Sequence, residues 1–178
     1  MAAWWTDVYA ARFSQMFDGG PVARWGFRPE WPGPELDICA FPAASGGRVF
    51  CSLGLTHYAG QLGEIAEVML SVERGWESTP ALLARTLFRA VEERVALRPG
   101  LALECAEEVR PGIGRRGLYL SLPEVPLRRL CSVHHAGWTG WILRASLISA
   151  QDGAYLLRHG RGSFEALLAR RPERRLTT

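Results

Sequence analysis

The chain has 178 residues, of which 48% are hydrophobic and 22% charged, and its net charge is +3. This composition places it among ordinary globular proteins, and the small charge argues against a nucleic-acid-binding protein. The length suits a single domain that buries most of its unfolded surface. Every basic residue is Arg, which indicates the codon bias of a GC-rich, bacterial genome.

Membrane spans and metal frameworks are not expected. No run approaches the roughly 18 apolar residues of a membrane-spanning helix, and the segment from Met1 to Asp7 lacks the features of a signal peptide. We therefore expect a cytoplasmic protein without membrane contact. No Cys-x-x-Cys pair is present, so zinc binding is not expected. The cysteines are Cys39, Cys51, Cys105 and Cys131.

The N-terminal part is predicted to form a helix, a loop and then strands. Apolar residues at helical spacing predict a helix from Trp5 to Phe17, ended by Gly19-Gly20. The stretch from Pro21 to Pro34 is rich in Pro, Gly and Trp and is predicted to be a loop. Period-two alternation and β-branched residues then predict three consecutive strands. These strands cover 35–41, 48–55 and 64–72.

Two cysteines are predicted to face each other. If the turn from Pro42 to Gly47 closes a symmetric hairpin, Cys39 and Cys51 lie opposite each other, within reach of a disulfide. In a cytoplasmic protein we expect two reduced core thiols instead.

The second half is predicted to add a long helix, more strands and two short helices. Thr79 and Pro80 predict the start of a helix that covers the sheet and ends at Pro99-Gly100. A capping box at Ser149–Asp152 predicts a helix that ends at His159-Gly160, and Ser163 is predicted to cap the last helix. The further strands are predicted at 101–109, 117–122, 127–134 and 138–147.

This order of elements predicts the fold class. Helix, strands, helix, strands and helices follow one another without regular βαβ alternation. We therefore expect an α+β domain with a mixed, largely antiparallel sheet of six or seven strands covered by helices. It is predicted to span residues 1–170, with a basic, frayed tail at 171–178.

The three consecutive strands carry a resemblance to a known family. The first ends in Phe41-Pro42, the second rises to Ser52-Leu-Gly54, and the third contains Ala66–Leu70 before a closing Trp76. In this order and spacing the block resembles the suppressor-of-fused (SUFU) family. The resemblance extends over roughly Trp4 to Arg170.

The resemblance implies a non-catalytic, cofactor-free module that binds another protein. For bacterial members it implies an immunity protein that neutralises a cognate toxin, acting as a monomer or homodimer. An adaptor or chaperone for a secreted effector is a second hypothesis. A third is a small hydrolase that uses His57 with Ser52 or a cysteine, together with Asp37 or Glu67.

Six residues are candidates for contact with the partner. Aromatic side chains in or beside loops are natural anchors for a protein partner. Glu67 interrupts an apolar strand, so it must pair with an Arg, cap a backbone group or face a partner. The candidates are Trp25, Trp31, His57, Tyr58, Glu67 and Trp76.

The remaining motifs are better explained by structure than by chemistry. Gly112–Gly117 matches a dinucleotide motif but precedes a predicted strand, so a hairpin connection is favoured. His134 and His135 point to opposite faces of a strand and cannot easily share a metal ion. His159–Ser163 could bind an anion but is favoured as a turn between helices, and the Arg-rich tail is favoured as a solvated terminus.

Overall fold

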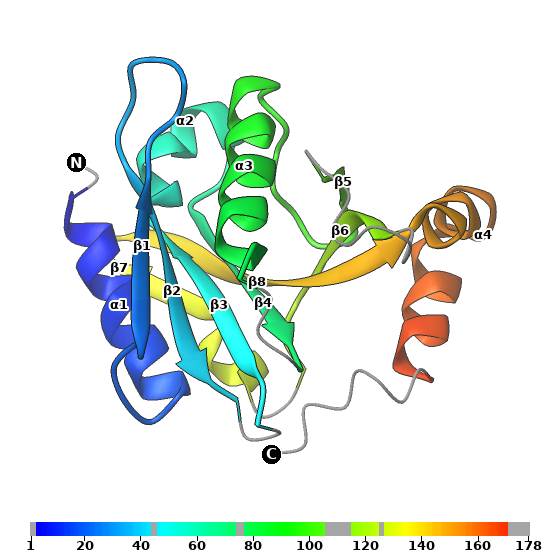
Figure 1. Ribbon diagram of the computed structural model, residues 1–178, viewed down its shortest axis with the longest axis horizontal. Helices are drawn as coiled ribbons and strands as arrows, with labels where there is room; N and C mark the ends of the chain where they lie inside the picture. The colour runs from blue at the N-terminus through cyan, green and yellow to red at the C-terminus, as the bar shows by residue number, and fades with distance from the viewer. Residues whose placement is uncertain (1–2, 44–45, 74–76, 106–114, 125–126, 171–178) are drawn as a thin grey trace.

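Hydrophobic clusters on both faces of one sheet organise the chain. The computed structural model describes residues 3–43, 46–73, 77–105, 115–124 and 127–170. The helices and strands, with the two short 3-10 helices labelled η (Figure 1), are α1 (Ala3–Met16), β1 (Ala23–Phe27), β2 (Leu36–Pro42), β3 (Arg48–Leu53), η1 (Leu55–Tyr58), α2 (Ala59–Leu62), β4 (Ala66–Val72), α3 (Thr79–Glu92), β5 (Ala102–Glu104), β6 (Arg115–Ser121), η2 (Leu127–Leu130), β7 (Ser132–His135), β8 (Trp138–Ser149) and α4 (Ala150–Ala169).

The sheet is mixed but largely antiparallel, as predicted. In the described residues its eight strands follow the order β1-β2-β3-β4-β8-β6-β5, with β7 also paired to β8. The β4–β8 pair is parallel, and all other pairs are antiparallel. Because the sheet is largely antiparallel and its strands do not alternate regularly with helices, the class is α+β.

The twelve-residue strand β8 joins the parts of the sheet. Its first residues, Trp138–Trp141, pair with β7, and its last residues, 144–149, pair with β6. Along the other edge of β8, residues 141–145 pair with β4. Strands from both halves of the sequence therefore meet on this one element.

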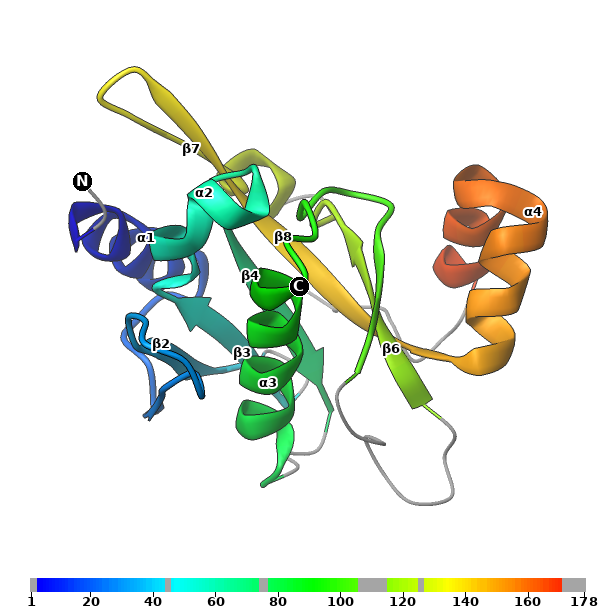
Figure 2. The same ribbon diagram turned by 90° about the horizontal axis from the view of Figure 1, so that it is seen from above.

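The two faces of the sheet carry different helices. On one face Leu83 and Leu87 of α3 pack with Ile38 and Leu120 in the largest cluster of buried residues. On the other face α1 forms a cluster over β2, β3 and β8, and α4 forms a separate one over Tyr119. Both ribbon views place α1 and α4 at opposite ends of the molecule (Figures 1 and 2).

One segment predicted to be a loop contains a strand. Within the stretch from Pro21 to Pro34, Ala23–Phe27 form β1 and pair antiparallel with β2. Three of its five residues are exposed, so the strand lacks the alternation of apolar residues that predicts a half-buried strand. Backbone pairing at the edge of the sheet defines β1, and side-chain pattern does not reveal it.

Three other boundaries differ from prediction. The segment from Leu55 to Leu62, between β3 and β4, forms η1 and α2. Leu127–Leu130 form η2 instead of a strand, since Arg128 N–H donates to the Glu124 carbonyl (2.9 Å). The predicted strand 101–109 is β5 as far as residue 104, and residues 106–109 lie outside the described residues.

Helix α3 ends at Glu92, earlier than the predicted Pro99-Gly100. Arg94 adopts a left-handed conformation with φ of 53°, and Val95 N–H donates to the Ala90 carbonyl (2.9 Å). This is the hydrogen bonding of a Schellman C-cap, with Arg where Gly is usual. The sequence offered no Gly to mark this end.

Several local predictions are confirmed. Ser149 and Asp152 form the predicted capping box at the start of α4. Gly160 has non-helical torsions (φ 76°, ψ 171°), so the chain turns there within α4. Cys39 is the direct cross-strand partner of Cys51, and both thiols are free, as expected of reduced core cysteines.

Replacing Gly140 with Ala is expected to destabilise the fold. A Cβ at this position would overlap the Tyr9 hydroxyl oxygen of α1 and lie 3.1 Å from the Ile65 carbonyl oxygen. Overpacking of this kind costs about 2 kcal/mol or more. Urea denaturation measures the loss. Gly153→Ala is the control, because no heavy atom lies within 4 Å of its Cβ position, and it should stabilise α4 by about 0.5 kcal/mol. Equal effects of both substitutions would contradict the close approach of α1 to β8.

Candidate functional site

The pairing of β3 with β4 ends where the candidate site begins. The last directly paired residues are Cys51 and Met69. Beyond them Val68 N–H donates to the Ser52 hydroxyl oxygen (2.8 Å), so a side chain replaces a backbone carbonyl. The strands separate here, and η1 leaves the sheet.

The Glu67 carboxylate satisfies the backbone groups that this separation exposes. Its Oε1 accepts from the N–H groups of Gly54 (2.9 Å) and Thr56 (3.2 Å). Its Oε2 accepts from the Ser52 hydroxyl (2.6 Å). Of the three roles predicted for Glu67, capping backbone groups is the one observed. The side chain is fully buried, so it holds η1 from inside the domain.

Burial dominates the electrostatics of this cluster. Desolvation raises the pKa of Glu67 to about 7, although its hydrogen bonds with Ser52, Thr56 and Gly54 act in the opposite direction. Burial and the nearby Glu67 raise the pKa of Tyr9. Tyr9 stays neutral and donates to the carbonyls of Trp141 (3.1 Å) and Ile65 (3.3 Å).

The η1 segment packs against the connection between β1 and β2. The Tyr58 hydroxyl donates to the Pro34 carbonyl. Gly54 has a φ of +106°, and a Cβ on it would lie 3.0 Å from the Glu35 carbonyl oxygen, so Gly is required at this position. We call residues 28–35 and 55–62 together the loop end. Figure 1 shows the β1–β2 connection and α2 at the same end of the sheet.

The structure brings four of the six candidate residues to the loop end. Trp31 is half-buried and packs edge-to-face on Phe88 of α3, with ring centroids 5.7 Å apart. His57 Nε2 lies 3.4 Å from Thr6 Oγ1 of α1, and burial lowers its pKa. Tyr58 and Glu67 are buried, so their side chains do not face solvent.

The two remaining candidates lie elsewhere. Trp25 is on the edge strand β1, 38% exposed, with its ring centroid 6.1 Å from that of Phe50. Trp76 lies outside the described residues.

An aromatic surface on the β7–β8 hairpin was not among the candidates. Trp138 is 56% exposed and lies directly opposite His135, whose ring packs at a tilt against Trp4 of α1, with ring centroids 4.3 Å apart. Trp138 lies in a predicted strand. The sequence of that strand does not indicate that its first residues project beyond the helices that cover the sheet. His134 makes separate contacts with Ser132 (2.7 Å) and Thr139 (3.0 Å), so the two histidines do not converge.

The described residues offer no metal site and no helix that could cross a bilayer. No group of three or more His, Cys, Asp or Glu in this part of the chain is arranged to hold a metal ion. None of these helices is both long and apolar enough to span a membrane.

Replacing Glu67 with Gln is expected to remove a pH dependence of stability. The pKa of Glu67 is about 7 in the folded chain and near 4.5 in the unfolded chain. Between these values the folded chain keeps a proton that the unfolded chain releases, so the wild-type unfolding free energy falls as pH rises from 4.5 to 7. Relative to wild type, Glu67→Gln should therefore gain up to about 3 kcal/mol across this window.

Urea denaturation at several pH values measures this difference. The control is Glu64→Gln, which removes an exposed carboxylate three residues away. Its stability curve should stay parallel to that of wild type. A Glu67→Gln curve that also runs parallel to wild type would show that Glu67 titrates normally.

The sequence by itself matches no protein-family model and no curated protein. Solved structures nevertheless match across nearly the whole chain. A protein described as a SUFU (suppressor of fused protein) homologue from Neisseria gonorrhoeae superimposes with a TM-score of 0.71, at 13% identity. The match covers 93% of this chain and 88% of that one.

A second similar structure is a chain of the Sufu–Fu complex. It has a TM-score of 0.67 and 11% identity, with 93% of this chain and 84% of that chain covered. Both matches agree with the resemblance found in the three-strand block. The chain has a SUFU-like fold.

Proposed function

We propose that this chain is a non-catalytic protein-binding module that acts in the cytoplasm through its β1 edge and the adjoining loop end. The observation that carries the proposal is an exposed Trp25 on the edge strand of a SUFU-like fold. The Sufu–Fu structure, which is a complex of two proteins, supports a binding role for this fold.

The β1 edge offers backbone groups to a partner strand. In the described part of the chain β1 pairs with β2 on one side and with no strand on the other. Unpaired strand edges are templates for strand addition, in which backbone hydrogen bonds give affinity. Trp25 is held against Phe50, so little side-chain entropy is lost when a partner covers it.

Charged pairs surround this edge. Arg24 pairs with Asp37, and Arg28 pairs with Glu35 (3.2 Å). Ion pairs as exposed as Arg28–Glu35 add little to folding stability, but they favour partners of complementary charge and speed association. Trp31 and His57 extend the surface to the loop end, and Tyr58 and Glu67 hold that end in shape from within.

The buried cluster argues against the hydrolase hypothesis. Ser52 is fully buried, and its hydroxyl is engaged by Glu67 and Val68 N–H, so no substrate reaches it. Burial raises the pKa of each of the four cysteines, to about 11 for Cys39, which keeps the thiols protonated at neutral pH. Neutral thiols are poor nucleophiles.

The finer proposal is immunity against a cognate bacterial toxin, with adaptor or chaperone activity for a secreted effector as the second candidate. Both rest on the SUFU resemblance, and both use the same binding surface. They differ in consequence, because an immunity protein abolishes the toxicity of its partner whereas a chaperone preserves it.

Trp25→Ala is expected to weaken binding of the partner by at least tenfold, as for a central aromatic anchor. The matched control is Trp138→Ala, which removes an equally large exposed ring from the β7–β8 hairpin. Affinity purification from the native organism identifies the partner, and titration with each variant measures its affinity. Loss of binding with Trp138→Ala alone would show that the partner binds the β7–β8 hairpin and not the β1 edge.

Co-expression with the partner separates the two finer functions. Cells that produce a toxic partner should survive when the wild-type chain is present and die when Trp25→Ala replaces it. Survival without this chain, together with a partner that aggregates in its absence, would favour the chaperone hypothesis. Recovery of no partner under native conditions would count against protein binding altogether.

A further inference from the structure

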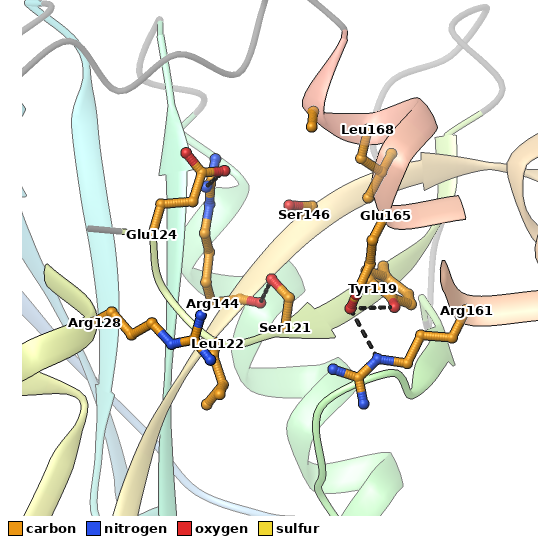
Figure 3. Close-up of a pocket in the computed structure, with 11 residues that line it drawn as sticks. Tyr119, Ser121, Leu122, Glu124, Arg128, Arg144, Ser146, Arg161, Glu165 and Leu168 are labelled. Carbon is orange, nitrogen blue, oxygen red and sulfur yellow. Dashed lines mark hydrogen bonds and ion pairs between the residues drawn. The ribbon is translucent and has the colours of Figure 1, made fainter. Parts of the chain in front are cut away.

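We propose that a polar pocket between the η2 region and α4 binds a carboxylate. The pocket has a volume of about 230 Å³. Its floor is formed by β6 and β8, and its walls by the η2 region and α4 (Figure 3). This site is separate from the β1 edge, so the proposal can be tested independently of the proposed function.

The pocket lies on the face of the sheet that α1 and α4 share. Side chains at every second position of β8 point to this face. Ile142 lies in the cluster under α1, and Ile148 lies in the cluster under α4. Arg144 and Ser146, between them, line the pocket. The face is therefore apolar beneath each helix and polar in the gap.

A buried arginine forms the centre of the pocket. The Arg144 side chain is only 8% exposed and donates to Glu124 Oε1 (2.8 Å), whereas the Glu124 side chain is 67% exposed. Glu124 thus holds the buried guanidinium from the solvent side of the pocket. With Glu124 in place, the buried guanidinium still contributes positive charge at the bottom of the pocket, which attracts a ligand carboxylate.

The other charged groups in the pocket are a hydrogen-bonded cluster on the α4 side and an exposed arginine on the η2 side. On α4, Glu165 accepts from Arg161 (2.9 Å) and from the Tyr119 hydroxyl (3.0 Å). Figure 3 shows these three side chains grouped on one side and Arg128 on the other. Arg128 is exposed and makes no ion pair with any described residue. It is free to meet an anion at the mouth.

The balance of charge favours a single carboxylate over a phosphate. Three arginines and two glutamates line the pocket, which leaves an excess of one positive charge. A carboxylate neutralises this excess, whereas a phosphate dianion reverses it. The planar guanidinium of Arg also matches the two oxygens of a carboxylate. The hydroxyl of Ser146 on the floor offers a further donor.

The test uses blocked glutamate, N-acetyl-glutamate methylamide, whose side chain bears its one carboxylate. Titration followed by NMR should shift the amide signals of Ser121 and Ser146 and saturate. Blocked glutamine, which has the same shape without the charge, should not bind. Arg128→Gln should weaken binding by roughly tenfold. Arg129→Gln, the exposed neighbour outside the pocket, should leave affinity unchanged.

Two further titrations identify the source of the carboxylate and its competitor. A blocked peptide with one Glu among alanines binds more tightly than blocked glutamate if a protein chain supplies the group, and no more tightly if a small acid does. Inorganic phosphate should bind more weakly than blocked glutamate. The proposal is overturned if phosphate binds better, if glutamine binds equally, if no signal saturates, or if Arg129→Gln weakens binding as much as Arg128→Gln.

Discussion

The architecture depends on a carboxylate that replaces strand pairing. Where β3 and β4 separate, Glu67 and Ser52 take over the hydrogen bonds that a neighbouring backbone would have made. A buried backbone N–H without an acceptor is costly. The η1 segment can therefore leave the sheet only because the Glu67 carboxylate accepts hydrogen bonds from its backbone N–H groups. The loop end, Tyr58 and the β1–β2 connection are all positioned through that segment. The energetic cost of the arrangement is the desolvation that raises the pKa of Glu67.

The two faces of the sheet are covered by helices in different ways. On the first face α3, together with η1 and α2, packs in a single continuous cluster. The second face is divided between α1 and α4, which come from opposite ends of the chain (Figure 2). Division leaves polar residues of β8 at the bottom of a gap. The molecule therefore presents an edge strand with an exposed aromatic residue, and a charged pocket between the η2 region and α4.

The sequence predicted the structure correctly where apolar and polar residues alternate along a strand, or where a side chain caps a helix. The central strands, the capping box at Ser149 and the facing cysteines are specified by local patterns, and they agree with the structure. Strand β1 could not be predicted, since its side chains are mostly exposed and its identity comes from backbone pairing. The end of α3 at Arg94 was also hidden, because a left-handed Arg has no sequence signal.

For the site, the anomaly of a carboxylate in an apolar strand identified Glu67, but only the structure could decide among its possible partners. The pocket around Arg144 left no such signal, since Arg144, Glu124 and Arg161 are far apart in sequence. It forms where β6 and β8 pass between the η2 region and α4. Residue patterns within one element do not carry that information.

The buried cysteine thiols can report on local and global unfolding of this chain. Cys39 and Cys51 lie in the paired strands β2 and β3, and their burial and raised pKa values protect them from alkylating reagents while the sheet is intact. Their modification therefore requires the β2–β3 region to open. Cys105 follows the short edge strand β5, and Cys131 follows η2, so these two thiols become accessible in smaller openings. The time course of alkylation thus resolves the hierarchy of motions in the native chain without any added label.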